Sequence, residues 1–203
     1  MQTRSQPETE SRLGTIATIL RWVSWLSLWG QLAFALASAL MLGIAVSGRQ
    51  FNQALAPIFG ARVIDGESVN TPGLGIGMFF ASCSIAVMLF GIFVALRQAR
   101  FAKRLRSPNS SVHPRKVEVT ELLRLATLTG LAGLLLALLG EGASLAVLLA
   151  KAIAQVPGAA FYDPSRVIRS LDIFVPMANL NGLAGHLTGT VAALGLLNWL
   201  HRS

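Results

Sequence analysis

The sequence predicts an all-α integral membrane protein built as a four-helix bundle, with both termini on the cytoplasmic side. Composition is one reason: of 203 residues, 53% are hydrophobic and only 13% are charged, whereas about 25% of residues are charged in soluble domains. A second reason is that the chain contains four long apolar runs. A third is that Lys and Arg are unevenly distributed between the two sides of those runs.

Each of the four apolar runs is long enough to cross a bilayer, because a hydrocarbon core of about 30 Å requires about 20 apolar residues per helix. The first run is also too long for the apolar region of a signal peptide, so it is expected to stay in the membrane. The prediction is one membrane domain over residues 22–200, preceded by a solvated cytoplasmic tail over 1–21. Its transmembrane helices are 22–46, 74–96, 125–150 and 173–200.

The three connections differ in composition. The first, 47–73, contains Pro57 and Pro72 among several glycines and is predicted to be a loop with a short interfacial segment. The second, 97–124, is predicted to be a basic cytoplasmic loop that begins as a helix and breaks at SPNSSVHP. The third, 156–172, carries the turn-rich sequence VPGAAFYDPSR.

The distribution of basic residues predicts the orientation. Only five of the 17 Lys and Arg residues lie on the side of the first and third connections. The other twelve lie with the N-terminal tail, the second connection and the C-terminus. Because basic residues are retained on the cytoplasmic side of a membrane, both termini are predicted to be cytoplasmic. Trp22, Trp25 and Trp199 would then anchor the helices at that same interface.

The strongest concentration of charge directly follows the second apolar run. Five basic residues occupy ten positions there: Arg97, Arg100, Lys103, Arg104 and Arg106. One interpretation is that they set the topology and contact anionic head groups of the bilayer, at about 1 kcal/mol each near the surface. The alternative is a docking surface for a cytoplasmic partner. Phe101 is the one aromatic residue among them, so this segment does not resemble a nucleic-acid groove and no nucleic acid is expected.

Two ionisable residues interrupt the apolar runs, Glu141 in LLGEGASL and His186 in NGLAGHLTG. Since a charge inside the bilayer costs about 2.5 to 3.5 kcal/mol on insertion scales, both are functional candidates. A rise of about 1.5 Å per residue places them within roughly one helical turn in depth. They are predicted to form a hydrogen-bonded pair, a proton relay or a transient metal site, because Fe(II) accepts imidazole and carboxylate together. The structural alternative is a polar clamp between helices.

The fourth apolar run is the most polar of the four. Asn179, His186 and Thr190 recur at spacings of seven and four residues, so they share a helix face that is predicted to look inward. With Glu141 they make up the predicted ion pathway or intramembrane polar pair. Small residues of the same run, two of them forming a GxxxG motif, are predicted to pack against other helices: Gly182, Gly185 and Gly189.

The few reactive side chains exclude several kinds of chemistry. Cys83 is the single cysteine and the three histidines are widely separated, which excludes a disulfide framework, a CxxC redox site and zinc-ribbon spacing. One intramembrane histidine does not supply the two ligands of a bis-histidine haem within one subunit. Glu141 and His186 have no candidate nucleophile nearby. We therefore expect no cofactor and no enzymatic activity.

Most of residues 22–200 resemble a known family, in the stretches LRWVSWLSLWGQL, RQARFAKRLR, LLRLATLTGLAGLLLALLGEGASLAVLLAKA and LDIFVPMANLNGLAGHLTG. They are similar to a four-helix family of cyanobacteria and plastids, grouped as a domain of unknown function, that includes the chloroplast inner-envelope "permease in chloroplasts". Plastid members have been described both as iron permeases and as components of the inner-envelope protein-import translocon. The chain lacks a long transit peptide, so we expect a bacterial-type member in a plasma or thylakoid membrane.

These observations predict an integral membrane transport protein, an iron or other metal-cation permease. The alternative is a non-enzymatic subunit of a membrane protein-translocation or assembly complex, with translocon subunits as partners. Because four spans rarely enclose a pore alone, a homo-oligomer is also expected.

Overall fold

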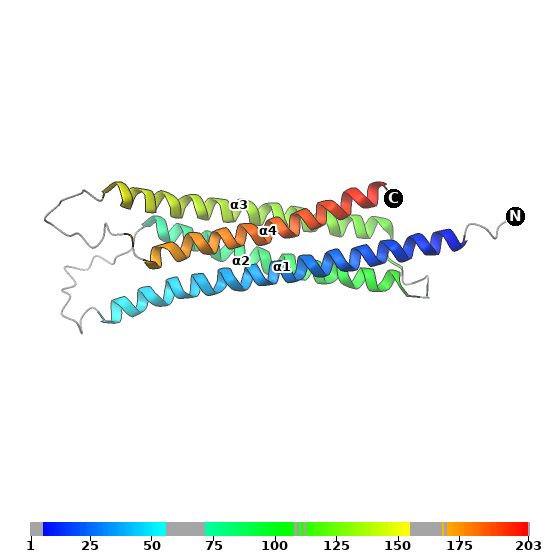
Figure 1. The fold of residues 1–203 in the computed structure, drawn as a ribbon, viewed down its shortest axis with the longest axis horizontal. Helices are drawn as coiled ribbons and strands as arrows, with labels where there is room; N and C mark the ends of the chain where they lie inside the picture. Colours follow the sequence, from blue (N-terminus) through cyan, green and yellow to red (C-terminus); the bar gives the residue numbers. More distant parts are fainter. Residues whose placement is uncertain are drawn as a thin grey trace. The chain divides into compact units, whose positions relative to one another are not determined.

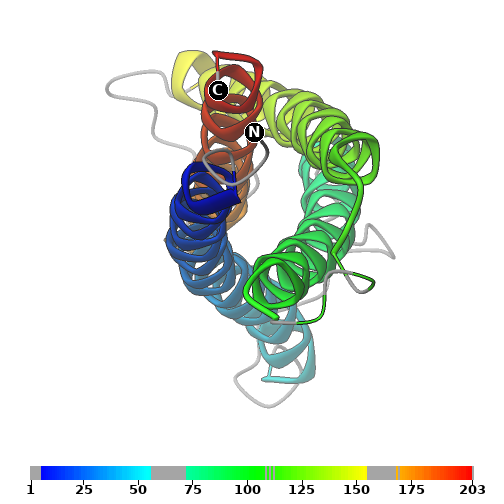
Figure 2. The ribbon, with the colours of Figure 1, turned by 90° about the vertical axis from the view of Figure 1, so that its right-hand side faces the viewer.

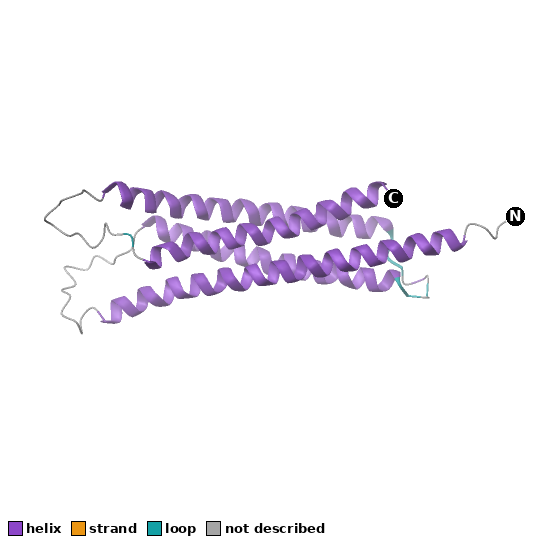
Figure 3. Ribbon diagram, viewed as in Figure 1, coloured by secondary structure: helices purple, strands orange, loops and turns teal. Residues whose placement is uncertain are grey.

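The computed structural model describes residues 6–55, 72–107, 109, 111, 113–154, 168 and 170–202. Nearly all of them belong to four α-helices, namely α1 (Gln6–Leu55), α2 (Pro72–Leu105), α3 (Lys116–Ala154) and α4 (Ser170–Arg202) (Figure 1). No strand occurs in this described part of the chain (Figure 3). Each helix includes a segment long and apolar enough to cross a membrane. The predicted all-α fold with four spanning helices is thus confirmed, while the cytoplasmic placement of the termini stays a prediction.

The helices are longer than the predicted spans. They contain 50, 34, 39 and 33 residues and so measure about 50 Å or more, against about 30 Å for the hydrocarbon core. α1 begins within the segment predicted to be a solvated tail, because Ala17 and Leu20 pack into the protein and are buried. It also continues to Leu55, into the first connection. The rest of that connection and most of the third one, residues 56–71 and 155–167, lie outside the described residues.

The chain divides into two compact units, and every helix contributes one segment to each. The first unit consists of Met1–Ala33, Val87–Ala132 and Gly185–Ser203, and the second of Phe34–Ala86 and Gly133–Ala184. Figure 2 looks at the first unit along its helices, with the start of α1 in blue and the end of α4 in red. Each unit is therefore a packing of four helix segments.

The inward positions of α2 and α4, buried except for the half-buried Gly91 and Gly189, recur with a period of 3.5 residues, as in the seam of a coiled coil. Their spacings alternate between three and four residues, and most of the side chains are small or polar. In α2 the seam contains Leu74, Gly77, Ala81, Ser84, Met88, Gly91, Ala95, Gln98 and Ala102. In α4 it contains Asp172, Val175, Asn179, Gly182, His186, Gly189, Ala193, Leu196 and Leu200. Small residues allow the close backbone approach on which helix association in lipid depends.

Large apolar side chains occupy the outer faces instead. Leu26, Phe79 and Leu128 are between 64% and 75% exposed. An apolar core does occur in the first unit, where Phe101 and Leu123 belong to a buried cluster with residues of all four helices. The second unit contains a smaller apolar cluster of buried residues: Ala45, Leu74 and Val175. Outside these two clusters the polarity of the helices is reversed relative to a soluble bundle, as expected for a protein surrounded by lipid.

Candidate polar cavity and its surroundings

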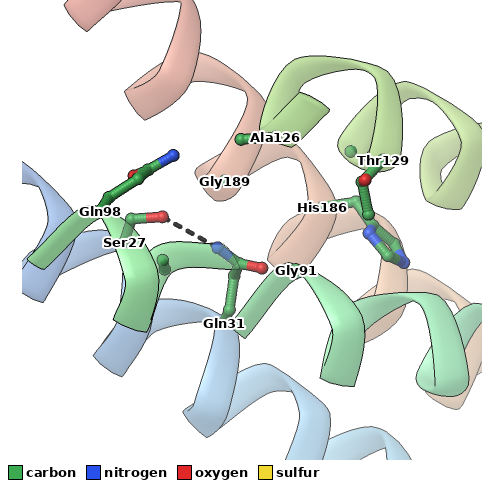
Figure 4. Close-up of a pocket in the computed structure, with 10 residues that line it drawn as sticks. Ser27, Gln31, Gly91, Gln98, Ala126, Thr129, His186 and Gly189 are labelled. Atoms are coloured by element: carbon green, nitrogen blue, oxygen red, sulfur yellow. Dashed lines mark hydrogen bonds between the residues drawn. The ribbon is translucent and has the colours of Figure 1, made fainter. Parts of the chain in front are cut away.

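A small polar cavity lies within the first unit, and all four helices line it (Figure 4). Its volume is about 10 Å³, which is space for about one water molecule. The cavity is lined by Ser27 and Gln31 of α1, Gly91, Ala95 and Gln98 of α2, Ala126, Thr129 and Gly130 of α3, and His186 and Gly189 of α4.

Gln31 is held between two glycines. Its side chain is 5% exposed, and its Nε2 donates a hydrogen bond to Ser27 Oγ at 2.9 Å (Figure 4). A Cβ atom added to Gly91 would lie 2.6 Å from Gln31 Oε1, and one added to Gly189 would lie 2.7 Å from Nε2. The absence of both Cβ atoms therefore lets the amide group fit between α2 and α4.

The sequence-based prediction assigned no role to Gln31. Its signal was present in the spacing of α1, where Ala17, Leu20, Ser24, Ser27 and Gln31 follow one another at three or four residues and are all buried. Small and polar residues at that spacing, within a run rich in Leu and Trp, mark the inward face of a helix in lipid.

His186 contributes the imidazole of the cavity and is 2% exposed. One turn further along α4, Thr190 Oγ1 donates a hydrogen bond to the His186 carbonyl oxygen at 2.8 Å. α3 passes close to this turn, since a Cβ atom added to Gly130 would lie 3.3 Å from Thr190 Cβ. The residues predicted to share the inward face of α4, Asn179 included, are all buried. Their part in an ion pathway stays a prediction.

The other buried polar groups of the first unit are uncharged. Ser24 Oγ donates to Gln98 Oε1 at 3.4 Å, and Thr127 Oγ1 donates to the Leu123 carbonyl oxygen at 3.0 Å. Among the described residues of this unit, no Asp, Glu, Lys or Arg is buried. Nor does any group of three or more His, Cys, Asp and Glu gather in the described part of the chain. A cation entering the cavity would therefore meet one imidazole and neutral amide and hydroxyl oxygens.

In the second unit, Asn179 fastens three helices together. It is fully buried, and its Nδ2 donates to the carbonyl oxygens of Gly77 at 3.3 Å and Val175 at 3.2 Å. Its Oδ1 has no hydrogen-bond partner among the described residues, but it lies against Gly140 of α3, where an added Cβ atom would collide with it. This geometry allows a weak contact from the Gly140 Cα–H. The side chain of Asn179 thus acts as a clamp between α4, α2 and α3.

The three glycines predicted to be packing positions differ in their neighbours. A Cβ atom added to Gly182 would lie 3.0 Å from Ser84 Oγ and 3.8 Å from Ala137 Cβ, both in the second unit. Gly189 adjoins Gln31 in the first unit, and Gly185 is buried. Gly182 thus faces Ser84 and Gly189 faces Gln31, each within its own unit, and the packing role of the three glycines stays a prediction.

Glu141 lies on α3 in the second unit, at the edge of the buried face. Gly140 before it is buried, whereas Gly142 after it is exposed and has open space where a Cβ atom would be. The Oε2 atom of Glu141 has no hydrogen-bond partner among the described residues. His186 belongs to the first unit, so its predicted pairing with Glu141 stays a prediction.

A buried ion pair connects the end of α3 to the start of α4. Lys151 Nζ donates to Asp172 Oδ2 at 2.7 Å, and the two side chains are 9% and 8% exposed. Both residues lie directly outside the predicted spans 125–150 and 173–200, and no pair between them was predicted. Opposite charges at the two ends of one connection are the signal that would have suggested the pair.

The basic segment of α2 is docked through its apolar side. Phe101 is 8% exposed within the apolar cluster of the first unit. The guanidinium carbons of Arg97 and Arg104 each lie 5.9 Å from the centre of its ring. Arg106 Nη2 donates to Thr18 Oγ1 of α1 at 2.8 Å. All five basic residues of the segment are nevertheless exposed: Arg97, Arg100, Lys103, Arg104 and Arg106.

Comparison with known proteins now adds to this picture. The chain is 24% identical over 196 residues to "Protein TIC 21, chloroplastic" of Arabidopsis thaliana, a match that covers 94% of this chain but 59% of that protein. No solved structure matches the chain. A family model matches residues 10–201, nearly the whole chain. The protein therefore belongs to the family described as "Protein of unknown function (DUF3611)", in agreement with the four-helix family that its sequence resembles.

Proposed function

We propose that this protein is a non-enzymatic transporter of a small metal cation, such as ferrous iron, in a bacterial plasma or thylakoid membrane. The polar cavity of the first unit is the observation that supports this proposal. Four helices contribute hydroxyl, amide and imidazole groups to one buried layer, while their outer faces carry large apolar side chains. Holding two helices together needs one or two polar contacts, whereas moving an ion requires polar groups at the centre of the bundle.

The cavity is closed in this conformation. A volume of about 10 Å³ admits about one water molecule and excludes a hydrated metal ion. A cation would pass only after losing water, with the Gln31 and Thr129 oxygens and the His186 imidazole replacing part of its hydration shell. Because these ligands are neutral and few, the ion would be held transiently and released.

Glu141 supplies the negative charge in this proposal. A carboxylate within the membrane attracts cations where lipid offers no charge, and Glu141 Oε2 has no hydrogen-bond partner among the described residues. Since four spans leave little room for a path within one chain, the transporter is proposed to work as a homo-oligomer.

Uptake of radioactive iron into liposomes that contain the purified protein tests the proposal. Gln31→Leu and Glu141→Gln keep the size of the side chain and remove, respectively, the amide and the charge, and both are expected to reduce uptake at least tenfold. Ser82→Ala is the matched control, because Ser82 is exposed and bonds to its own helix at the Met78 carbonyl oxygen. Wild-type uptake no higher than that of empty liposomes would refute cation transport. Unchanged uptake with Glu141→Gln alone would remove that carboxylate from the pathway.

A second function is supported by the exposed basic segment of α2 and by the name of the relative, in line with the translocon role that the resemblance implies. In this alternative the protein is a subunit of a protein-translocation or assembly complex and transports no ion itself. Affinity capture of partners with wild type and Glu141→Gln separates the two functions. A scaffold would keep its partners in the variant, because a glutamine amide can still form hydrogen bonds.

A further inference from the structure

One exposed side of α2 carries apolar residues along its first part and basic residues further along the helix. Exposed residues recur at alternating spacings of three and four, so they lie in stripes along one side of the helix. One stripe contains Phe90, Phe93, Arg97, Arg100 and Arg104, and the neighbouring one contains Leu89, Phe93, Leu96, Arg100 and Lys103. All of these side chains are exposed. We call the whole set, Leu89 to Arg104, the α2 outer face.

The apolar half of the α2 outer face contains two exposed aromatic rings, those of Phe90 and Phe93. Phe90 is 46% and Phe93 is 53% exposed, and their ring centres lie 6.3 Å apart. Leu89 beside them is 56% exposed. In a spanning helix this surface contacts acyl chains, and its last apolar residue, Leu96, marks the depth at which the head groups begin.

The cationic half is held in position by a buried ring. Phe101 points its side chain into the apolar cluster, and Arg97 and Arg104 stand on either side of it along the helix, each 5.9 Å from the ring centre. A cation over an aromatic face is attracted by the ring, which favours side-chain conformations that keep the two guanidinium groups near Phe101. Arg100 lies between them in the same stripe.

No ion pair with an Asp or Glu forms at these charges among the residues that the structure describes. The 34 residues of α2 include no Asp or Glu. The ion pair found among the described residues joins Lys151 to Asp172, and neither of these residues belongs to α2. Guanidinium groups bind phosphate through parallel hydrogen bonds, and here they directly follow an exposed apolar surface on the same side of the helix.

We propose that the α2 outer face binds one anionic phospholipid. Its phosphate and charged head group contact Arg97, Arg100 and Arg104, while an acyl chain lies over Phe90 and Phe93. A membrane lipid fits better than an acidic protein segment, because the latter would use only the cationic half and leave the aromatic half unexplained. This site does not depend on the proposed transport function.

Native mass spectrometry of the detergent-purified full chain, with phosphatidylglycerol and phosphatidylcholine at equal concentration, tests the proposal. Wild type is expected to bind phosphatidylglycerol at least tenfold more tightly. Arg97→Gln/Arg104→Gln should weaken that binding about 25-fold, at about fivefold per cation. Arg115→Gln/Lys116→Gln is the matched control, since it removes the same charge from exposed positions at the start of α3. Its effect should stay below about threefold.

A second pair of variants examines the aromatic half. Phe90→Ala/Phe93→Ala should weaken phosphatidylglycerol binding several-fold and leave binding of a polyglutamate peptide unchanged. Phe101→Leu keeps an apolar side chain in the cluster but removes the ring between the arginines, and should weaken lipid binding about threefold. The proposal would be overturned by equal losses of binding in the Arg97/Arg104 and Arg115/Lys116 double variants, by no preference for phosphatidylglycerol, or by unchanged binding in the phenylalanine double variant.

Discussion

The two units use their polar side chains in different ways. In the first unit the buried polar residues include no Asp, Glu, Lys or Arg among those described, and five of them line a cavity with room for about one water molecule: Ser27, Gln31, Gln98, Thr129 and His186. In the second unit Asn179 closes three helices against one another, and the Lys151–Asp172 pair joins two helix ends. Every buried charge of the described residues lies in this second unit.

The polar groups of the first unit that line the cavity border a space, whereas those of the second unit bond one helix to another. Gln31 has one described side-chain partner, Ser27, and borders a space. Asn179 makes two hydrogen bonds to carbonyl oxygens and is fully buried. Polar residues that look alike in sequence therefore border a cavity in one unit and join helices in the other. Stability should depend more on the polar groups of the second unit.

Breaking the ion pair should give the largest effect. Lys151→Met leaves the Asp172 carboxylate buried without its charged partner, and we expect a loss of about 3 kcal/mol in the free energy of unfolding. Lys151→Met/Asp172→Leu removes both charges and should recover most of that loss. Unfolding in mixed detergent micelles measures both. A single substitution that costs less than about 1 kcal/mol would show that the second unit is not stiffened by this pair.

The two glycines of α3 that flank Glu141, Gly140 and Gly142, allow a sharper comparison inside the second unit. Gly140→Ala places a Cβ atom against Asn179 and Phe80, and the crowding should cost about 1 to 3 kcal/mol. Gly142→Ala meets open space and should stabilise α3 by up to about 1 kcal/mol through helix propensity. The same unfolding titration should thus give opposite signs for neighbouring residues. Equal effects would contradict the clamp geometry.

In the first unit, Gln31→Leu should change stability little. It removes the hydrogen bond to Ser27, a kind of contact worth about 0.6 kcal/mol in membrane proteins, and keeps a side chain of similar size between the two glycines. A loss above about 2 kcal/mol in the free energy of unfolding would show that Gln31 holds helices together as Asn179 does. The proposed difference between the two units would then be wrong.

The smallest expected effect concerns the predicted pair of Glu141 and His186. A double-mutant cycle with Glu141→Gln and His186→Asn should give a coupling of at least a few tenths of a kcal/mol if the two side chains interact. Strict additivity would assign them to separate partners, one in each unit. Either result defines how independent the two units are.

Several features were determined by the sequence alone, because they depend on local properties of the chain. Apolar length and charge content predict four spanning helices, and the structure has four helices that meet those criteria. The helical start of the basic segment was also predictable, since residues 97–105 contain no Gly or Pro. The start of α1 was not predictable, because residues 6–21 are polar enough to resemble a solvated tail. Only the tertiary structure shows that Ala17 and Leu20 are buried in the core.

The tertiary structure decided which polar residues face a cavity, which clamp helices and which pair across a connection. In a soluble helix the apolar face identifies the inside, but lipid makes the outer face equally apolar, so the periodicity of hydrophobicity is weak. The position of Gln31 between Gly91 and Gly189 depends on three helices meeting at one level. The pairing of Lys151 with Asp172 depends on how two helix ends approach each other. Such juxtapositions belong to the packing of separate segments, and no single stretch of the sequence contains them.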